Sequence, residues 1–225
     1  QHAFDDSIFD NMQPQNGVIV AENILVDIDH NAREIEIPYC VYNIDPSRVQ
    51  LVTIPKLIVN NLDGMMGIDG RGLSGVVRFT KKADLYDEAP FWGRNTFKNT
   101  YEIEVDADNQ RYKGIDGILY SKDGKMLLKC PARKAGKVII PEGVTQICQF
   151  AFEDSEIESV VFPDSLKIIG NRAFKNCSHL KNVDFGSGIT QIEDLNKENG
   201  TRSFCHFFED CGKLKHVSIP KQVET

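Results

Sequence analysis

The fold is decided by a motif that occurs three times in the second half of the chain: IESVVFP at 157–163, LKNVDFG at 180–186 and LKHVSIP at 214–220. Each copy has an apolar residue, two polar or small residues, an apolar residue, a variable residue and an apolar residue before Pro or Gly. A shorter version ends at Pro141. Measured at the final Pro or Gly, the copies run from 141 to 163, 163 to 186 and 186 to 220, which are steps of 22, 23 and 34 residues. Repeats at such a period predict a solenoid.

A second motif follows these segments and repeats with them. ICQFAF at 147–152 matches IGNRAF at 169–174, and WGRNTFKNT at 92–100 overlays IGNRAFKNC at 169–177 without a gap. The array is therefore expected to start by about residue 80. The longest step contains an insertion of about eleven residues, at 193–203.

Each motif has the alternation of a strand with one buried face. Successive side chains of a strand point to opposite faces, so Val160 and Phe162 are expected in the core and Val161 on the surface. Pro or Gly then ends the strand, and the Ala-Phe pair is expected to close the core on the far side. One unit of about 23 residues cannot bury its own apolar face. The units are therefore predicted to stack about 4.8 Å apart into a parallel sheet.

Residues 166–177 and 180–192 together resemble the BspA-type leucine-rich repeat of bacterial surface proteins. The stretch from Asp116 to Pro131 resembles a hairpin insertion common in that family. The resemblance covers roughly residues 80–225 and implies a β-rich α/β solenoid: a right-handed stack with a parallel sheet, a few short helices and an irregular β N-terminal region. Ser165 and Ser187 stand where other leucine-rich repeats place an Asn or Cys ladder.

Three regions are expected along the chain. Residues 1–16 are interpreted as a tail or linker, because they are polar and lack periodicity. Residues 17–79 contain short β-like runs broken by turn formers, and they are either degenerate repeats forming a cap or a separate small β-sandwich. Residues 80–225 are the repeats. Because little sequence follows Pro220, either a short segment caps the array or its edge is left for a partner.

Composition excludes several classes of function. With 26 basic and 33 acidic residues the formal charge is −7, and no Lys/Arg cluster is present, which argues against nucleic acid as a partner. No apolar run reaches the length of a membrane span, and no segment has the pattern of a signal peptide, so the chain is expected to be soluble. Six cysteines are too few for a disulfide scaffold, so a hydrophobic core must hold the fold together.

No catalytic, cofactor or metal site is predicted. The GxGxxG match at 70–75 precedes a strand instead of a helix, and the acidic stretches at 63–69 and 106–109 lack the spacing of a calcium loop. His179, His206 and His216 have no ligand partner at a defined spacing and are interpreted as surface residues.

Two cysteines occupy equivalent repeat positions on neighbouring turns, Cys177 and Cys211. Stacked turns bring such positions close enough for a disulfide, and buried free thiols are the other interpretation. Cys205, near the insertion, is the better candidate for any exposed pair.

The outward rows of the sheet are the predicted binding surface, since a solenoid offers an extended face. Aligned strands give two rows: Glu104, Ile139, Val161, Asp184 and Ser218, and beside them Glu102, Lys137, Ser159, Asn182 and His216. The apolar pair Ile139 and Val161 between charges is interpreted as a small recognition patch; a merely solvated face is the alternative.

These residues and the resemblance predict a non-enzymatic binding module. The resemblance implies a secreted or cell-surface bacterial protein that mediates adhesion by recognising protein or glycan through the sheet face, with a lipid or cell-wall anchor outside the given sequence. The alternative is a scaffolding segment that self-assembles through its sheet face or its C-terminal edge. A third alternative is an enzyme with its site in residues 17–78.

Overall fold

A computed structural model of the chain describes residues 12–21, 23–29, 31–41, 43–44, 55–60, 74–83, 97–189, 207–217 and 220–221. These residues form a β-solenoid with fifteen strands and no helix, so the few short helices expected from the resemblance are absent from this part. Tight turns connect the strands instead. The acidic stretch at 63–69 and the insertion at 193–203 lie outside the described residues.

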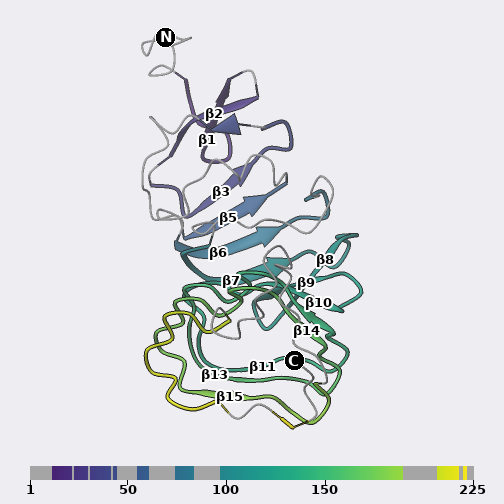
Figure 1. Cartoon of the computed structure of the whole chain (residues 1–225). Coiled ribbons are helices and arrows are strands. Elements are labelled where there is room, and N and C mark those ends of the chain that lie inside the picture. Colours follow the sequence, from purple (N-terminus) through teal and green to yellow (C-terminus); the bar gives the residue numbers. More distant parts are fainter. Residues whose placement is uncertain are drawn as a thin grey trace, which may run out of the picture.

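One face of the solenoid consists of parallel strands from successive turns (Figure 1). Four pair in the order β3 (Glu34–Ile37), β5 (Lys56–Val59), β6 (Ser74–Phe79) and β7 (Asn99–Val105). Three more pair in the order β11 (Ala135–Ile139), β13 (Glu156–Val161) and β15 (Asn182–Asp184). β5 begins directly after Pro55. Proline is tolerated directly before a strand, where its missing N–H breaks no ladder bond.

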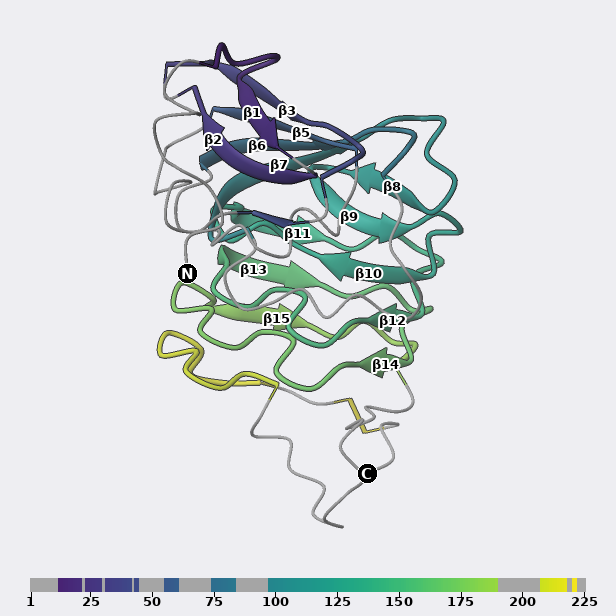
Figure 2. The same ribbon diagram turned by 90° about the horizontal axis from the view of Figure 1, so that it is seen from above.

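Two further sheets complete the turns (Figure 2). One runs in the order β14 (Ile168–Ile169), β12 (Gln146–Ile147), β10 (Met126–Lys129), β9 (Ile118–Ser121) and β8 (Tyr112–Ile115). The other is N-terminal and contains β1 (Val18–Ala21), β2 (Ile24–Ile28) and β4 (Asn43–Ile44).

The hairpin insertion expected at Asp116–Pro131 is formed by β9 and β10, which pair antiparallel. β8 also pairs antiparallel with β9 and forms a second hairpin before it. The turn of this β8–β9 hairpin, Asp116-Gly117, has positive φ at both residues, 49° and 72°, as a two-residue type I′ turn requires. The Gly117 carbonyl accepts a hydrogen bond from the N–H of Ile103 in β7 at 2.9 Å. The turn therefore occupies the edge of β7, and β11 does not pair with β7. We call this interruption of the parallel sheet, between β7 and β11, the sheet break.

One continuous hydrophobic core extends from Val18 to Cys211 and underlies both sides of the sheet break. Val160 and Phe162 are buried while Val161 is half-buried, so the predicted strand alternation is confirmed. The domain boundaries expected at residues 16 and 79 stay predictions.

The Ala-Phe motif builds an aromatic stack across three turns. The rings of Phe152 and Phe174 lie 4.6 Å apart at an interplanar angle of 12°, and those of Phe174 and Phe208 lie 5.3 Å apart at 27°. Ala151 and Ala173 are fully buried beside them. The predicted closing of the core by these rings is confirmed.

Hydrogen bonds between side chains and the backbone of the preceding turn tie the stack together. The Cys177 thiol donates to the Phe152 carbonyl at 3.0 Å, and the Cys211 thiol donates to the Phe174 carbonyl at the same distance. Both cysteines are free and buried, which agrees with the free-thiol interpretation. Cys205 lies outside the described residues.

The ladder position after the strands is polar. The Ser165 hydroxyl donates to the Val144 carbonyl at 2.8 Å, so serine replaces the Asn or Cys of other leucine-rich repeats. In the N-terminal turns the Asn60 amide donates to the Ile37 carbonyl at 3.1 Å, and Asn109 is buried in an equivalent role. The sequence analysis missed both asparagines, although Asn60 directly follows a strand.

We expect the protein to lose stability in alkali between about pH 9 and pH 12. Burial raises the pKa of the Cys130 and Cys148 thiols from 9.0 to about 12. The unfolded chain therefore releases these protons first, and the stabilisation present below pH 9 is lost as the pH rises through that window. At the steepest point, the free energy of unfolding falls by about 1.4 kcal/mol per pH unit for each thiol. Urea unfolding at a series of pH values measures it.

Matched variants separate the contribution of the two thiols to this alkaline slope from the contributions of other titrating groups. Cys130→Ala combined with Cys148→Ala should flatten the alkaline slope, whereas Cys40→Ala, at an exposed cysteine, should leave it unchanged. Burial lowers the pKa of Lys129, so this lysine contributes a slope of opposite sign as the pH rises towards 10.5. An unchanged slope in the double variant would contradict the prediction.

Candidate binding site

The register of the sheet brings six of the ten predicted surface residues into two rows. Lys137 lies opposite Ser159 and Ser159 opposite Asn182; Ile139 lies opposite Val161 and Val161 opposite Asp184. This is the adjacency that the repeat alignment predicts. A binding role for these residues stays a prediction.

The repeat alignment places Glu102 and Glu104 at the head of these rows. The structure corrects this prediction, because the rows do not continue directly into β7. These residues pair with Val76 and Arg78 of β6, on the N-terminal side of the sheet break. The hairpin turn on the edge of β7 is the physical reason. The Glu104 carboxylate lies 3.2 Å from the Lys56 ammonium, within the N-terminal sheet.

At the other end, the rows are not extended by a described strand. His216 is exposed and lies outside the strands, as does the exposed His179, and Ser218 lies outside the described residues. Within the described part of the chain, no group of three or more His, Cys, Asp or Glu side chains is arranged to hold a metal ion.

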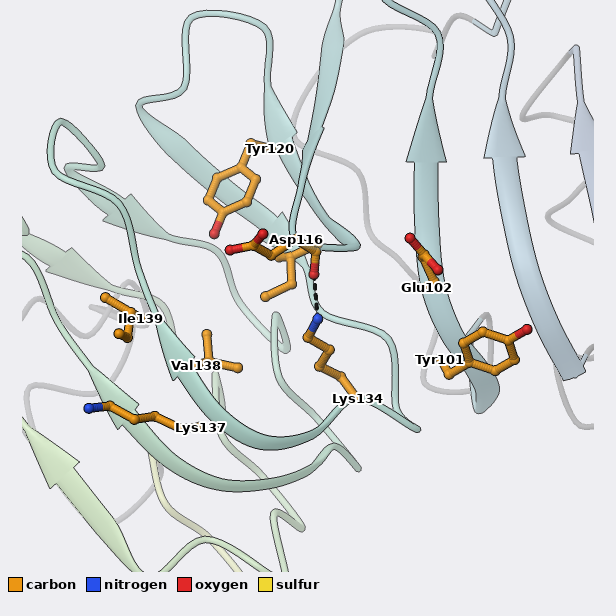
Figure 3. A pocket seen from close by; sticks show the side chains of 9 residues that line it. Tyr101, Glu102, Asp116, Tyr120, Lys134, Lys137, Val138 and Ile139 are labelled. Atoms are coloured by element: carbon orange, nitrogen blue, oxygen red, sulfur yellow. Dashed lines mark hydrogen bonds between the residues drawn. The ribbon is translucent and has the colours of Figure 1, made fainter.

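A cavity of about 520 Å³ opens on this face at the sheet break (Figure 3). Nine residues line it: Tyr101, Glu102, Asp116, Ile118, Tyr120, Lys134, Lys137, Val138 and Ile139. They come from β7, the hairpin, and β11 with the turn before it. Three of them, Glu102, Lys137 and Ile139, belong to the predicted surface rows.

The floor of the cavity is buried and mostly apolar, and its rim is exposed. Ile118, Tyr120 and Val138 are buried. At the rim, Tyr101 of β7 is 52% exposed and Ile139 of β11 is 62% exposed. The two lie on the opposite walls of the sheet break.

The charged groups of the cavity comprise two carboxylates and two ammonium groups. The Lys134 ammonium donates to the Asp116 backbone carbonyl, which fixes the turn of the hairpin against the approach to β11 (Figure 3). Glu102 and Lys137 make no ion pair with any described residue. Burial raises the pKa of the Tyr120 hydroxyl, so it remains a neutral donor and acceptor.

The lining combines charged, hydroxyl and apolar groups and contains no Ser, Cys or His. It offers hydrogen-bond donors and acceptors around an apolar floor, which is the usual composition of a small-ligand pocket. Tyr101, Asp116, Tyr120 and Lys134 are not predicted from the sequence, because only the docking of the hairpin turn on β7 brings them together.

The geometry defines the described part of the chain as a repeat solenoid with an exposed sheet face. Residues 132–225 match the BspA type leucine rich repeat region in six copies. This part of the chain is therefore a BspA-type leucine-rich repeat region, as the resemblance implied. No curated protein sequence matches the chain.

Solved structures of bacterial proteins have a similar fold. A leucine rich cell surface protein from Faecalibacterium prausnitzii A2-165 is 22% identical, with a TM-score of 0.53 over 88% of this chain and 48% of its own. The pneumococcal vaccine antigen PcpA is 17% identical, with a TM-score of 0.49 over 71% of this chain and 40% of its own. The chain thus spans less than half the length of either protein. Among the described residues, no apolar helix of membrane-spanning length occurs.

Proposed function

We propose that the chain is a non-enzymatic recognition module of a secreted or cell-surface bacterial protein, which mediates adhesion by binding protein or glycan through its sheet face. The observation that carries this proposal is the exposure of Ile139, 62%, beside Val161 on an otherwise polar sheet. Ile139 and Val161 together offer apolar area, and burying this area against a partner would stabilise a complex.

The surroundings of this pair support a specific interface. Lys137 and Asp184 lie in the adjoining row positions, so a charged rim surrounds the apolar centre, as in protein interfaces generally. The ladder hydrogen bonds of β11, β13 and β15 hold these side chains on a rigid surface, which lowers the entropy cost of binding.

The expected location follows from the repeat class. The similar Faecalibacterium structure is described as a cell surface protein, and BspA-type repeats resemble those of bacterial surface proteins. An anchor to lipid or cell wall would be supplied outside the given sequence.

The proposal is tested by capture on two panels, an array of immobilised glycans and an array of purified extracellular-matrix and plasma proteins. We expect Ile139→Lys combined with Val161→Lys to reduce capture at least tenfold, because two ammonium groups would be buried at the interface. Thermal unfolding should be unchanged, since both side chains point outwards. The control is Asp108→Lys with Lys122→Glu, at exposed turns away from the sheet face.

Two results would count against recognition through this face. Capture that survives the Ile139 and Val161 changes would place the interface elsewhere. Sedimentation that shows concentration-dependent assembly, abolished by the same changes, would favour the scaffolding alternative.

A further inference from the structure

The geometry points to the edge of β11 that faces the sheet break as a site where a partner protein adds an extended segment as a further strand. This inference rests on the proposed function and deepens it, because it makes the ligand of this part of the face a polypeptide. Main-chain hydrogen bonds supply the affinity in this mode of recognition, and the flanking side chains supply the specificity.

β11 uses only one of its two edges for pairing. In the sheet of order β11, β13 and β15, it pairs with β13 alone. The N–H of Ile140, directly after the strand, donates to the Val161 carbonyl of β13 at 3.0 Å. Backbone groups of alternate residues point to opposite edges, so Val138 also faces β13, whereas the N–H and C=O groups of Lys137 and Ile139 face the sheet break. No described residue hydrogen-bonds with these four groups.

The other strands near the sheet break have both edges covered. β13 uses both, because the N–H of Phe162 donates to the Asp184 carbonyl of β15 at 2.8 Å. β7 is covered at Ile103, whose N–H donates to the Gly117 carbonyl of the hairpin turn at 2.9 Å. An edge with unpaired N–H and C=O groups is a template for pairing with another chain. The edge of β11 is therefore where a partner strand would gain ladder hydrogen bonds.

The space beside this edge belongs to the cavity at the sheet break. Figure 3 shows the hairpin turn with Asp116 between β11 and the side chains of Tyr101 and Glu102, so the edge faces the turn and not β7. The cavity has a volume of about 520 Å³, and buried Ile118 and Val138 lie in its floor. A segment bound there would have backbone partners on one side and an apolar floor below.

The site is short and begins at a defined point. The N–H of Arg133 donates to the Thr100 carbonyl at 2.8 Å, which ties the approach to β11 against β7. At Gly136 a Cβ would meet no atom within 4 Å, so the start of the strand is uncovered. The register shifts between Gly136 and Lys137, and such an irregularity limits unspecific edge pairing. The regular free edge is thus Lys137 to Ile139, which takes a segment of about three residues.

The surrounding side chains define which segment fits. Side chains of a bound strand alternate, so a middle residue would point inwards onto Ile118 and Val138, and its neighbours would lie beside Lys137 and Ile139. An aliphatic residue suits the floor, and a β-branched residue suits the position beside Ile139. An acidic residue suits the position beside Lys137, and the Asp116 carboxylate of the opposite wall disfavours a second acid. The expected ligand is a segment with one acidic residue followed or preceded by two aliphatic residues.

The test uses the peptide acetyl-Thr-Glu-Val-Val-Thr-Ser-amide and the full chain labelled with ¹⁵N. NMR titration measures affinity, and amide hydrogen exchange measures which N–H groups become bonded. We expect a dissociation constant below about 1 mM. In the free chain the N–H groups of Lys137 and Ile139 should exchange faster than that of Val138, and near saturation with peptide their exchange should slow about tenfold.

N-methylated peptides separate backbone pairing from contacts of side chains. The N–H groups of alternate residues face the same edge of a strand, in either direction of the bound peptide. Removing one N–H at a time should therefore weaken binding about tenfold at alternate residues and change it little at the residues between them. Equal effects at neighbouring residues would overturn strand addition. Replacing the Glu of the peptide by Lys should weaken binding several-fold.

Variants of the chain locate the site. Ile139→Pro removes an N–H that makes no ladder bond and puts a ring carbon in its place, so it should abolish peptide binding while the pairing with β13 is kept. Ile139→Thr keeps the N–H and the β-branched shape and should retain binding within about threefold. Val161→Lys, one strand away on β13, should leave the affinity for the peptide unchanged. Thermal unfolding checks that each variant is folded.

The outcomes distinguish this inference from the proposed function. If the face captures macromolecules but the peptide does not bind, the strand site is overturned and the recognition module stands. Lys137 and Ile139 amides that are already protected in the free chain would mean that another segment of the chain covers the edge, which also overturns it. Dimers that are abolished by Ile139→Pro would assign the edge to a second copy instead. If neither panel nor the peptide is bound, the proposed function fails as well.

Discussion

Phe174→Ala should lower the free energy of unfolding by about 3–5 kcal/mol, as large-to-small changes of a fully buried aromatic residue do. The Phe174 ring is the middle member of the stack, 4.6 Å from Phe152 and 5.3 Å from Phe208, and it also packs 5.8 Å from Phe162. The cavity left by its removal would lie between three turns, and none of them can collapse without moving its neighbours. Urea unfolding followed by circular dichroism measures the loss.

The position within the stack provides the control for this prediction. Phe208 is half-buried, and among the described residues its ring stacks on Phe174 alone, so Phe208→Ala should cost clearly less than Phe174→Ala. Phe174→Leu keeps most of the side-chain volume, so its loss of unfolding free energy should lie between those of Phe208→Ala and Phe174→Ala. Equal losses for the two alanine variants would mean that stacking between turns is not what stabilises the array.

Gly170→Ala should destabilise the protein by about 3 kcal/mol, at the upper end of overpacking effects. A Cβ at Gly170 would lie 2.4 Å from the backbone nitrogen of Gln149 and 2.7 Å from the carbonyl carbon of Cys148. Both contacts are with backbone of the preceding turn, so no side-chain rotation relieves them. The Gly170 N–H also donates to the Ile147 carbonyl at 2.8 Å, and this bond would be strained as the turns separate.

Gly212→Ala is the matched control, because a Cβ there would meet no atom within 4 Å. Its free energy of unfolding should stay within about 0.5 kcal/mol of the parent, the usual range for surface changes. If Gly170→Ala were as stable as Gly212→Ala, the turns would not be packed at backbone distance at this position.

The repeat array could be predicted from the sequence because its signals are local and occur several times. The alternation at 157–163 sets which side chains are buried, and the Ile-Gly-x-x-Ala-Phe segment at 169–174 shows where backbones approach and where a ring closes the core. The register of Ile139 with Val161 follows from aligning the copies, since stacked repeats place equivalent residues side by side.

The sheet break could not be predicted, because it depends on a contact between segments that share no repeat. The sequence around Asp116-Gly117 indicates a hairpin, but nothing in it specifies that the turn binds the edge of β7. The cavity therefore combines residues such as Tyr101 and Lys134 that no alignment brings together. The sequence does contain a partial signal for the hydrogen-bonding role of Asn60, because this residue directly follows β5.

The sheet break also separates the length of the array from the cavity. All nine residues that line the cavity lie between positions 101 and 139, before β13 begins. Turns could therefore be gained or lost at the C-terminal end during evolution while these nine residues keep their places. Related proteins with different numbers of repeats would then differ in the length of the sheet face and not in the lining of the cavity.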